Sequence, residues 1–306
     1  PLFGIAQQQT DITRWEETAK RINIIRDKWG IPHIYGKTVA DCVFGLLYAQ
    51  CEDDFQRVEM NYITMLGRSS EVNGEKDLYE DLLVRMVIDT TEAIKDYERS
   101  PDWLKKLLNS FADGVNYYLY KNPKVRPAVL RTFKPWYPLT YTDGSISAIQ
   151  TSDLSANDIK KFYEGLSSDL AKRTTKDPEH LIGSNGFAIA PSKSASGNAM
   201  LYINPHVTFY FRPEVHMVSE EGLNAYGAVT WGQFFVYQGF NEHCGWMHTS
   251  SQADVADLYE ETIIKNDQGI FYMQDKKLLP VKTRKTSIAY KSATGLTIKE
   301  FKIYET

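Results

Sequence analysis

The sequence predicts an α+β protein in which a mostly helical first half precedes a strand-rich second half. Apolar residues before residue 160 recur at helical spacing, whereas those after residue 183 form short runs separated by Gly, Pro and Asn. A densely charged segment without an apolar face lies between them. We therefore divide the chain into a helical region at 1–159, a charged spacer at 160–183 and a strand-rich region at 184–306.

A β-hairpin is expected to open the chain. Arg21–Ile25 and Ile31–Tyr35 are rich in β-forming residues and are joined by a turn that contains Gly30. Apolar residues then follow helical spacing from Phe55 to Leu66 and again from Leu104 to Leu119. Both segments are predicted to be amphipathic helices whose apolar faces contact a core.

Short strands are expected throughout the second half. They are Gly186–Ala190, Ala199–Ile203, Glu214–Val218, Ala225–Val229, Phe234–Gln238 and Trp246–Ser250. From Ile263 onward the pattern predicts further hairpins. Because the sequence stops at Thr306 without a closing helix or polar tail, we expect a truncated chain.

Composition argues against several classes of partner. The 35 basic and 39 acidic residues give a net charge of -4, without a basic block that would neutralise phosphates, so no nucleic acid partner is expected. No apolar run approaches the length of a membrane span, so no membrane is expected either. Cys42, Cys51 and Cys244 form no CxxC pair, which leaves one disulfide or buried thiols as alternatives.

Common catalytic motifs are missing from the sequence. It contains no GxSxG, SxxK, HExxH or GxGxxG motif, and its six histidines form no helical pair suited to zinc. No organic cofactor is expected. Any hydrolytic activity therefore needs a nucleophile and a general base that these common motifs do not supply.

A block beginning at Gly183 resembles the start of the β chain in the penicillin acylase family. It reads GSNGFAIAPSKSASGNA over 183–199 and is followed by Asn204-Pro205-His206. Upstream, WGIPHIY at 29–35 and DCVFGLLYAQCEDDFQ at 41–56 are similar to two further family blocks. The similarity covers nearly the whole chain. It implies an N-terminal-nucleophile hydrolase with an αββα sandwich, periplasmic or secreted, whose α and β chains come from one precursor.

The resemblance implies that the chain is cut between Gly183 and Ser184 and that Ser184 is the nucleophile. A serine needs a base within hydrogen-bond reach. Cleavage would give Ser184 a free α-amino group, whose ordinary pKa of about 7.7 to 8.0 leaves a neutral fraction near pH 7. This amine can accept the hydroxyl proton, so no neighbouring His-Asp pair is required.

Further site residues are implied by the same resemblance. The backbone N–H of Ser250 would contribute to an oxyanion hole, and His206 would add a polar contact. The family asparagine and arginine that complete the site would lie beyond Thr306. Val207, Tyr237 and Gln238 are the candidate substrate-pocket residues.

A calcium site is also implied by the family. Calcium prefers carboxylate and carbonyl oxygens. The matching positions are Asp254, the carbonyl of Ala256, Asp257 and, from the α-chain region, Asp158.

The resulting hypothesis is a self-processing amidohydrolase that cleaves N-acyl amides, such as β-lactam side chains or N-acyl homoserine lactones, through an acyl-enzyme. His206 favours cephalosporin and homoserine-lactone acylases, and Gln238 stands where phenylacetyl-selective members have phenylalanine. The alternative is an unprocessed, noncatalytic, calcium-stabilised binding or structural protein of the same fold.

Overall fold

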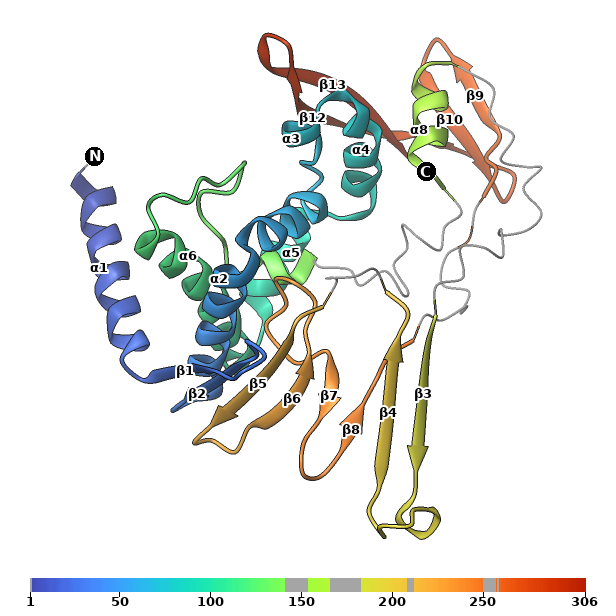
Figure 1. Ribbon diagram of the computed structural model, residues 1–306. Helices are drawn as coiled ribbons and strands as arrows, with labels where there is room; N and C mark the ends of the chain where they lie inside the picture. The colour runs from blue at the N-terminus through green and yellow to red at the C-terminus, as the bar shows by residue number, and fades with distance from the viewer. Residues whose placement is uncertain (1, 141–153, 166–182, 208–211, 250–256, 258) are drawn as a thin grey trace. The chain divides into compact units, whose positions relative to one another are not determined.

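The computed structural model describes residues 2–140, 154–165, 183–207, 212–249, 257 and 259–306, and of residues 2–8 only the backbone (Figure 1). The chain forms two compact units. The first combines residues 1–62, 90–141 and 177–250, and the second combines 63–89, 142–176 and 251–306. Segments that are distant in sequence therefore build each unit.

Helices supply most of the core of the first unit. They are α1 (Leu2–Ala19), α2 (Val39–Met65, which begins in this unit), α5 (Thr90–Arg99) and α6 (Asp102–Lys121), with the 3₁₀ turn η2 (Tyr137–Thr140). Tyr62 of α2 packs on Phe111 of α6 with ring centroids 5.2 Å apart. Gly114 permits this approach, because a Cβ there would lie 2.5 Å from the carbonyl oxygen of Phe44.

A six-stranded sheet completes the first unit in the order β1-β2-β5-β6-β7-β8. Its strands are β1 (Ile22–Arg26), β2 (Pro32–Gly36), β5 (Glu214–Ser219), β6 (Asn224–Ala228), β7 (Gln238–Phe240) and β8 (Gly245–Trp246). The β2–β5 pair is parallel and joins the start of the chain to its second half. The other neighbours in this sheet are antiparallel.

A separate hairpin carries the residue predicted as nucleophile. It consists of β3 (Ser184–Ile189) and β4 (Met200–Pro205), linked through the 3₁₀ turn η5 (Pro191–Lys193), and Figure 1 shows it as a long two-stranded ribbon. The strands pair antiparallel from Ser184 opposite Pro205 to Ile189 opposite Met200. Ser184 is thus the first residue of a regular strand, where the backbone fixes its position.

The second unit has its own apolar core. Its helical elements are α3 (Ser70–Asn73), η1 (Glu75–Asp77), α4 (Leu78–Val87) and α8 (Ala156–Tyr163). Its strands are β9 (Ile263–Asn266), β10 (Gly269–Gln274), β11 (Lys277–Pro280), β12 (Lys282–Ser292) and β13 (Gly295–Glu305). Leu82, Ile159 and Ile288 belong to one buried cluster, which joins α4, α8 and the β12–β13 hairpin.

The α+β class predicted from the sequence is confirmed, with helices first and strands later. Three local expectations are wrong. The chain does not open with the hairpin, because α1 precedes it. Phe234–Gln238 is not a strand, since β7 begins only at Gln238. The strand expected at Trp246–Ser250 is limited to β8, which ends at Trp246, and residues 247–249 are not in a strand. The predicted boundary at residue 160 falls within α8, so the first residues of the proposed spacer are helical.

No helix among the residues that the structure describes is long and apolar enough to cross a membrane.

Candidate active site around Ser184

The bond between Gly183 and Ser184 lies at the end of the β3–β4 hairpin. The carbonyl oxygen of Gly183 accepts a hydrogen bond from the backbone N–H of His206, with the two atoms 3.2 Å apart. This contact continues the strand register by one step beyond the pair of Ser184 and Pro205. In a self-cleavage reaction the Gly183 carbonyl would be the group attacked. It is polarised by the His206 N–H, which the hairpin holds in place.

A second contact joins Ser184 to Thr249, which follows β8 and lies outside any strand. The backbone N–H of Ser184 donates to the Oγ1 of Thr249 over 2.9 Å. The same Thr249 hydroxyl donates to the carbonyl oxygen of Ser184 over 3.1 Å. Thr249 thus brackets the backbone of the candidate nucleophile from both sides, although 65 residues separate the two positions.

Residues 245–249, which include β8 and Thr249, pack closely against the β3–β4 hairpin. A Cβ at Gly186 would lie only 1.7 Å from the sulfur of Met247, so no other residue fits there without displacing that side chain. Similarly, a Cβ at Gly245 would lie 2.4 Å from a methyl group of Leu201. The absence of side chains at these two glycines lets the β3–β4 hairpin approach residues 245–249.

Gln238 stabilises the backbone immediately before Thr249. Its side chain is 2% exposed, and its Nε2 donates to the carbonyl oxygen of His248 over 2.7 Å. The His248 ring lies on Tyr237 with centroids 4.4 Å apart, and the Arg212 guanidinium lies 4.4 Å from the same Tyr237 ring. Gln238 and Tyr237 therefore support the main chain just before Thr249 through His248, and Arg212 packs on Tyr237.

The other predicted site residues have different environments. The His206 imidazole is exposed, and its Nε2 lies 2.9 Å from the Oδ1 of Asn204, so its backbone N–H, and not its ring, contacts Gly183. Val207 is 39% exposed, whereas Tyr237 is 8% exposed. Ser250, the predicted oxyanion donor, lies outside the described residues.

The predicted calcium ligands are described only in part. Asp158 is buried, and its Oδ2 accepts hydrogen bonds from the N–H and hydroxyl of Ser155 in a capping box at the start of α8. Asp257 is exposed, and Asp254 and Ala256 lie outside the described residues. Within the described part of the chain, no group of three or more His, Cys, Asp or Glu residues is arranged to hold a metal. The donor set implied for calcium therefore stays a prediction.

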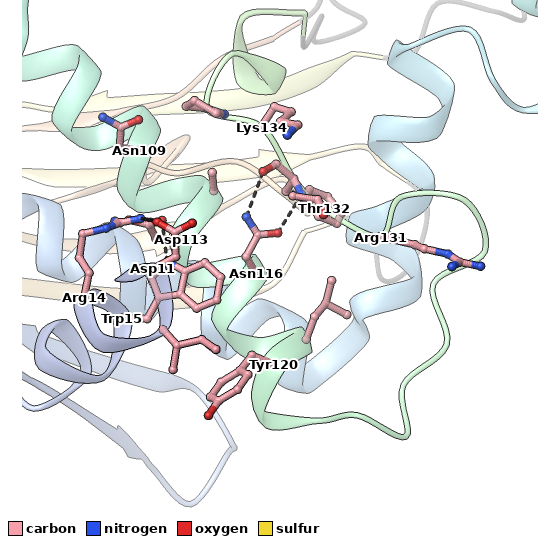
Figure 2. Close-up of a pocket in the computed structure, with 15 residues that line it drawn as sticks. Asp11, Arg14, Trp15, Asn109, Asp113, Asn116, Tyr120, Arg131, Thr132 and Lys134 are labelled. Atoms are coloured by element: carbon pink, nitrogen blue, oxygen red, sulfur yellow. Dashed lines mark hydrogen bonds and ion pairs between the residues drawn. The ribbon is translucent and has the colours of Figure 1, made fainter. Parts of the chain in front are cut away.

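A hollow of about 910 Å³ lies elsewhere in the first unit, between α1, α6 and residues 131–135 (Figure 2). Asp113 is one of its polar lining residues; it pairs with Arg14 and accepts from the Trp15 indole over 2.7 Å. Asn116 bonds both backbone groups of Phe133. These polar side chains already serve structural contacts, and the residues around Ser184 do not line the hollow.

Sequence reasoning did not assign a role to Thr249. It stands next to Ser250 in the sequence, but its contact with Ser184 depends on how β3 meets the chain beyond β8. A local motif carries no information on that contact. The contact of the buried Gln238 amide with the His248 backbone was not predicted either, and the place of Gln238 in a substrate pocket stays a prediction.

Comparison with known proteins gives one family and several relatives. A family model described as penicillin amidase matches residues 21–306. An acyl-homoserine lactone acylase QuiP from Pseudomonas fluorescens is 22% identical over 87% of this chain and 38% of its own length. An acyl-homoserine lactone acylase PvdQ from Pseudomonas putida is 24% identical over 88% of this chain and 38% of its own length. The chain thus spans about two fifths of these relatives.

A similar solved structure is the thermostable penicillin G acylase from Alcaligenes faecalis, at 17% identity and a TM-score of 0.38. The match covers 51% of this chain and 97% of that chain.

Proposed function

The chain belongs to the penicillin amidase family, and from that premise we propose that it is part of a self-processing amidohydrolase whose nucleophile is Ser184. The observation that carries the proposal is the arrangement around the Gly183–Ser184 bond. His206 donates to the carbonyl on one side of this bond, and Thr249 binds the nitrogen on the other side. A bond held at both ends, directly before a serine, is suited to intramolecular attack.

Self-cleavage would proceed by an N-to-O acyl shift. The Oγ of Ser184 forms a bond to the carbonyl carbon of Gly183, the bond from that carbon to the Ser184 nitrogen breaks, and the nitrogen takes up the hydroxyl proton. Water then hydrolyses the ester, which leaves a carboxylate on Gly183 and a free amine and hydroxyl on Ser184. During the attack, the His206 N–H is placed to stabilise negative charge on the Gly183 oxygen.

Turnover would use the amine released by cleavage as the base. The neutral amine accepts the Ser184 hydroxyl proton, Oγ bonds to the acyl carbon of the substrate, and the leaving amine of the substrate takes the proton as the amide bond breaks. Water then splits the acyl ester into a carboxylic acid and the regenerated serine. The backbone N–H of Ser250 is our candidate for one oxyanion donor in this reaction.

We propose N-acyl amides with flexible acyl chains as the substrate class. Relatives described as acyl-homoserine lactone acylases match this chain over 87% and 88% of its length, which supports N-acyl homoserine lactones first. Amides of β-lactam side chains are the second candidate, because the family model is that of penicillin amidase.

Calcium binding is a separate proposal. Among the candidate ligands, Asp158 is buried and lies in the first turn of α8. A calcium ion bound there would have a structural role at the start of this helix. If calcium binds there, chelation should lower the melting temperature of the full-length protein, and Asp158→Asn should remove that effect. An unchanged melting temperature after chelation would contradict the proposal.

The proposed function is tested by the fate of the Gly183–Ser184 bond. Full-length parent protein should give two bands on a denaturing gel, and the second chain should begin with Ser184. Ser184→Ala should stay as one uncut chain without amidase activity, while Ser192→Ala, an exposed serine in η5, should be processed like the parent. An uncut and inactive parent would favour the noncatalytic alternative, and normal processing of Ser184→Ala would exclude Ser184 as the nucleophile.

A further inference from the structure

We propose that Thr249 is a positioning residue for the nucleophile, whose hydroxyl orients the Ser184 nitrogen first as a peptide amide and, after cleavage, as the catalytic amine. This inference rests on the proposed function of Ser184. A hydroxyl has one hydrogen to donate and two lone pairs that accept. In Thr249 the hydrogen is directed to the Ser184 carbonyl at 3.1 Å, which leaves the lone pairs for the Ser184 nitrogen at 2.9 Å.

The direction of the Thr249 hydroxyl matters because it determines whether the Ser184 nitrogen donates to Thr249 or accepts from it. With its hydrogen bound to the Ser184 carbonyl, Thr249 can only accept from the nitrogen. One N–H of the amine would therefore point at Thr249, and rotation about the bond from nitrogen to Cα would be restricted. The remaining positions on nitrogen, including the lone pair of the neutral amine, are then directed away from Thr249 and are free to take the hydroxyl proton.

Residues behind Thr249 make this orientation rigid. The preceding carbonyl, that of His248, is bound by the buried amide of Gln238 at 2.7 Å, and the His248 ring rests on Tyr237. On the other side, the close contact of Gly186 with Met247 sets the separation between β3 and this segment. Because the backbone of Thr249 is held in this way, its hydroxyl can orient the Ser184 nitrogen, and little conformational entropy is lost during catalysis.

The two bonds of Thr249 act on the backbone of Ser184, so Thr249 is not itself expected to touch the substrate. Its loss should therefore reduce the rate of the chemical steps and leave substrate affinity nearly unchanged. A purely structural role predicts a different pattern, in which the methyl group of threonine matters as much as its hydroxyl and the effect appears in stability.

A pair of matched substitutions in the full-length protein separates these roles. Thr249→Val keeps the branched shape and removes both hydrogen bonds, whereas Thr249→Ser keeps the hydroxyl and removes the methyl group. Processing rates are followed on denaturing gels, and kcat and KM of the mature enzyme are measured with p-nitroanilides of aliphatic acids. Melting temperatures report on folding.

We expect Thr249→Val to slow processing and to lower kcat about tenfold, with KM within about twofold of the parent, and Thr249→Ser to stay within about threefold in all three quantities. The inference is overturned if Thr249→Val equals the parent, if Thr249→Ser is as slow as Thr249→Val, or if only KM changes. Should Thr249→Val fail to fold, Thr249→Ala takes its place, with the same outcomes expected.

Ser184→Ala distinguishes failure of this inference from failure of the proposed function. If Ser184→Ala is uncut and inactive while Thr249→Val behaves like the parent, only the role of Thr249 is wrong. If Ser184→Ala is itself cut and active, the proposed function is wrong and the role of Thr249 falls with it.

Discussion

The Glu59 carboxylate accepts a hydrogen bond from the backbone N–H of Leu130 over 2.8 Å, well inside the first unit. It also accepts from the N–H groups of Ala128 and Val129, at 2.9 and 2.8 Å. Glu59 lies on α2, 2% exposed, and the three donors belong to the irregular segment that follows α6. One carboxylate thus accepts from three consecutive backbone N–H groups, which belong to no helix or strand.

Glu59→Gln should therefore destabilise the protein. Its amide nitrogen would face at least one of the three backbone N–H groups, so that donor would lose its acceptor and the other two would lose a charged one, at a cost of about 1 to 3 kcal/mol. Urea unfolding of the full-length protein measures this difference. Glu52→Gln is the matched control, since Glu52 lies on the same helix in a half-exposed pair with Arg26 and should change stability by less than about 1 kcal/mol. Equal effects of the two substitutions would contradict the role of Glu59.

Asp81 gives the second unit a pH-dependent stability. It accepts from the N–H of Ser69 at 2.8 Å and of Ser70 at 2.7 Å, but burial raises the pKa of its carboxyl above the ordinary value and outweighs these bonds. The folded state then holds the proton more tightly than the unfolded state does. The contribution of Asp81 is consequently fully present below the ordinary aspartate pKa of about 3.9, and it falls as the pH rises through the raised pKa.

Comparison with Asp81→Asn isolates this effect, because other carboxylates contribute equally to both proteins. The parent should lose stability relative to Asp81→Asn as the pH rises from about 4 toward neutrality. Unfolding free energies at a series of pH values measure the difference. A difference that grows in favour of the parent with rising pH would show that the pKa of Asp81 is lowered and not raised.

The three cysteines should differ sharply in reactivity. Cys42 and Cys51 are buried free thiols, and Cys244 is an exposed one. Burial raises the pKa of the Cys42 thiol to about 11, and it also raises the pKa of Cys51. Since the thiolate is the reactive form, iodoacetamide should label Cys244 in the native protein and all three cysteines after unfolding in guanidinium. Peptide mass spectrometry reads out each site, and native labelling of Cys42 at the rate of Cys244 would contradict the description.

The parts of the fold that local patterns predict are those that local forces determine. The β1–β2 hairpin was predicted from its β-rich runs, and its turn is formed locally by the Asp27 carboxylate, which accepts from Trp29 and Ile31. The helix α1 was missed, because its sequence has no strong apolar stripe. Its Arg14 and Trp15 instead bind Asp113 of α6, about a hundred residues away.

The false strand at Phe234–Gln238 has a similar explanation. Its aromatic residues favour a strand, but the backbone just before it is bound by side chains of α2. Gln50 bonds the N–H of Gly232 and the carbonyl of Gln233, and Tyr62 donates to the carbonyl of Gly232. These contacts span about 180 residues in sequence and keep the chain in a turn. The contact between Thr249 and Ser184 escaped prediction for the same reason, whereas Ser184 itself was found because its block is contiguous.

If the proposed function holds, acyl-chain length should separate the full-length protein from phenylacetyl-selective members of its family. The family resemblance places Gln238 at the position of their pocket phenylalanine. In the structure Gln238 is buried and bound to the His248 backbone, so it adds no aromatic surface for a phenyl ring. Aliphatic chains gain affinity for the transition state with each buried methylene, by about 0.8 kcal/mol. Two additional carbons should therefore raise kcat/KM by about an order of magnitude until the pocket is filled.

The measurement uses full-length, processed protein with N-acyl homoserine lactones of increasing chain length, together with p-nitroanilides of phenylacetic and aliphatic acids. We expect a steep rise and a maximum within the aliphatic series, with phenylacetyl amides clearly slower than the best aliphatic substrate. Ser184→Ala serves as the blank, because any hydrolysis that it retains is not due to the proposed site. A flat length profile, or phenylacetyl amides that exceed every aliphatic substrate, would show that Gln238 and His206 do not mark specificity, while the test of Ser184 by processing would remain unaffected.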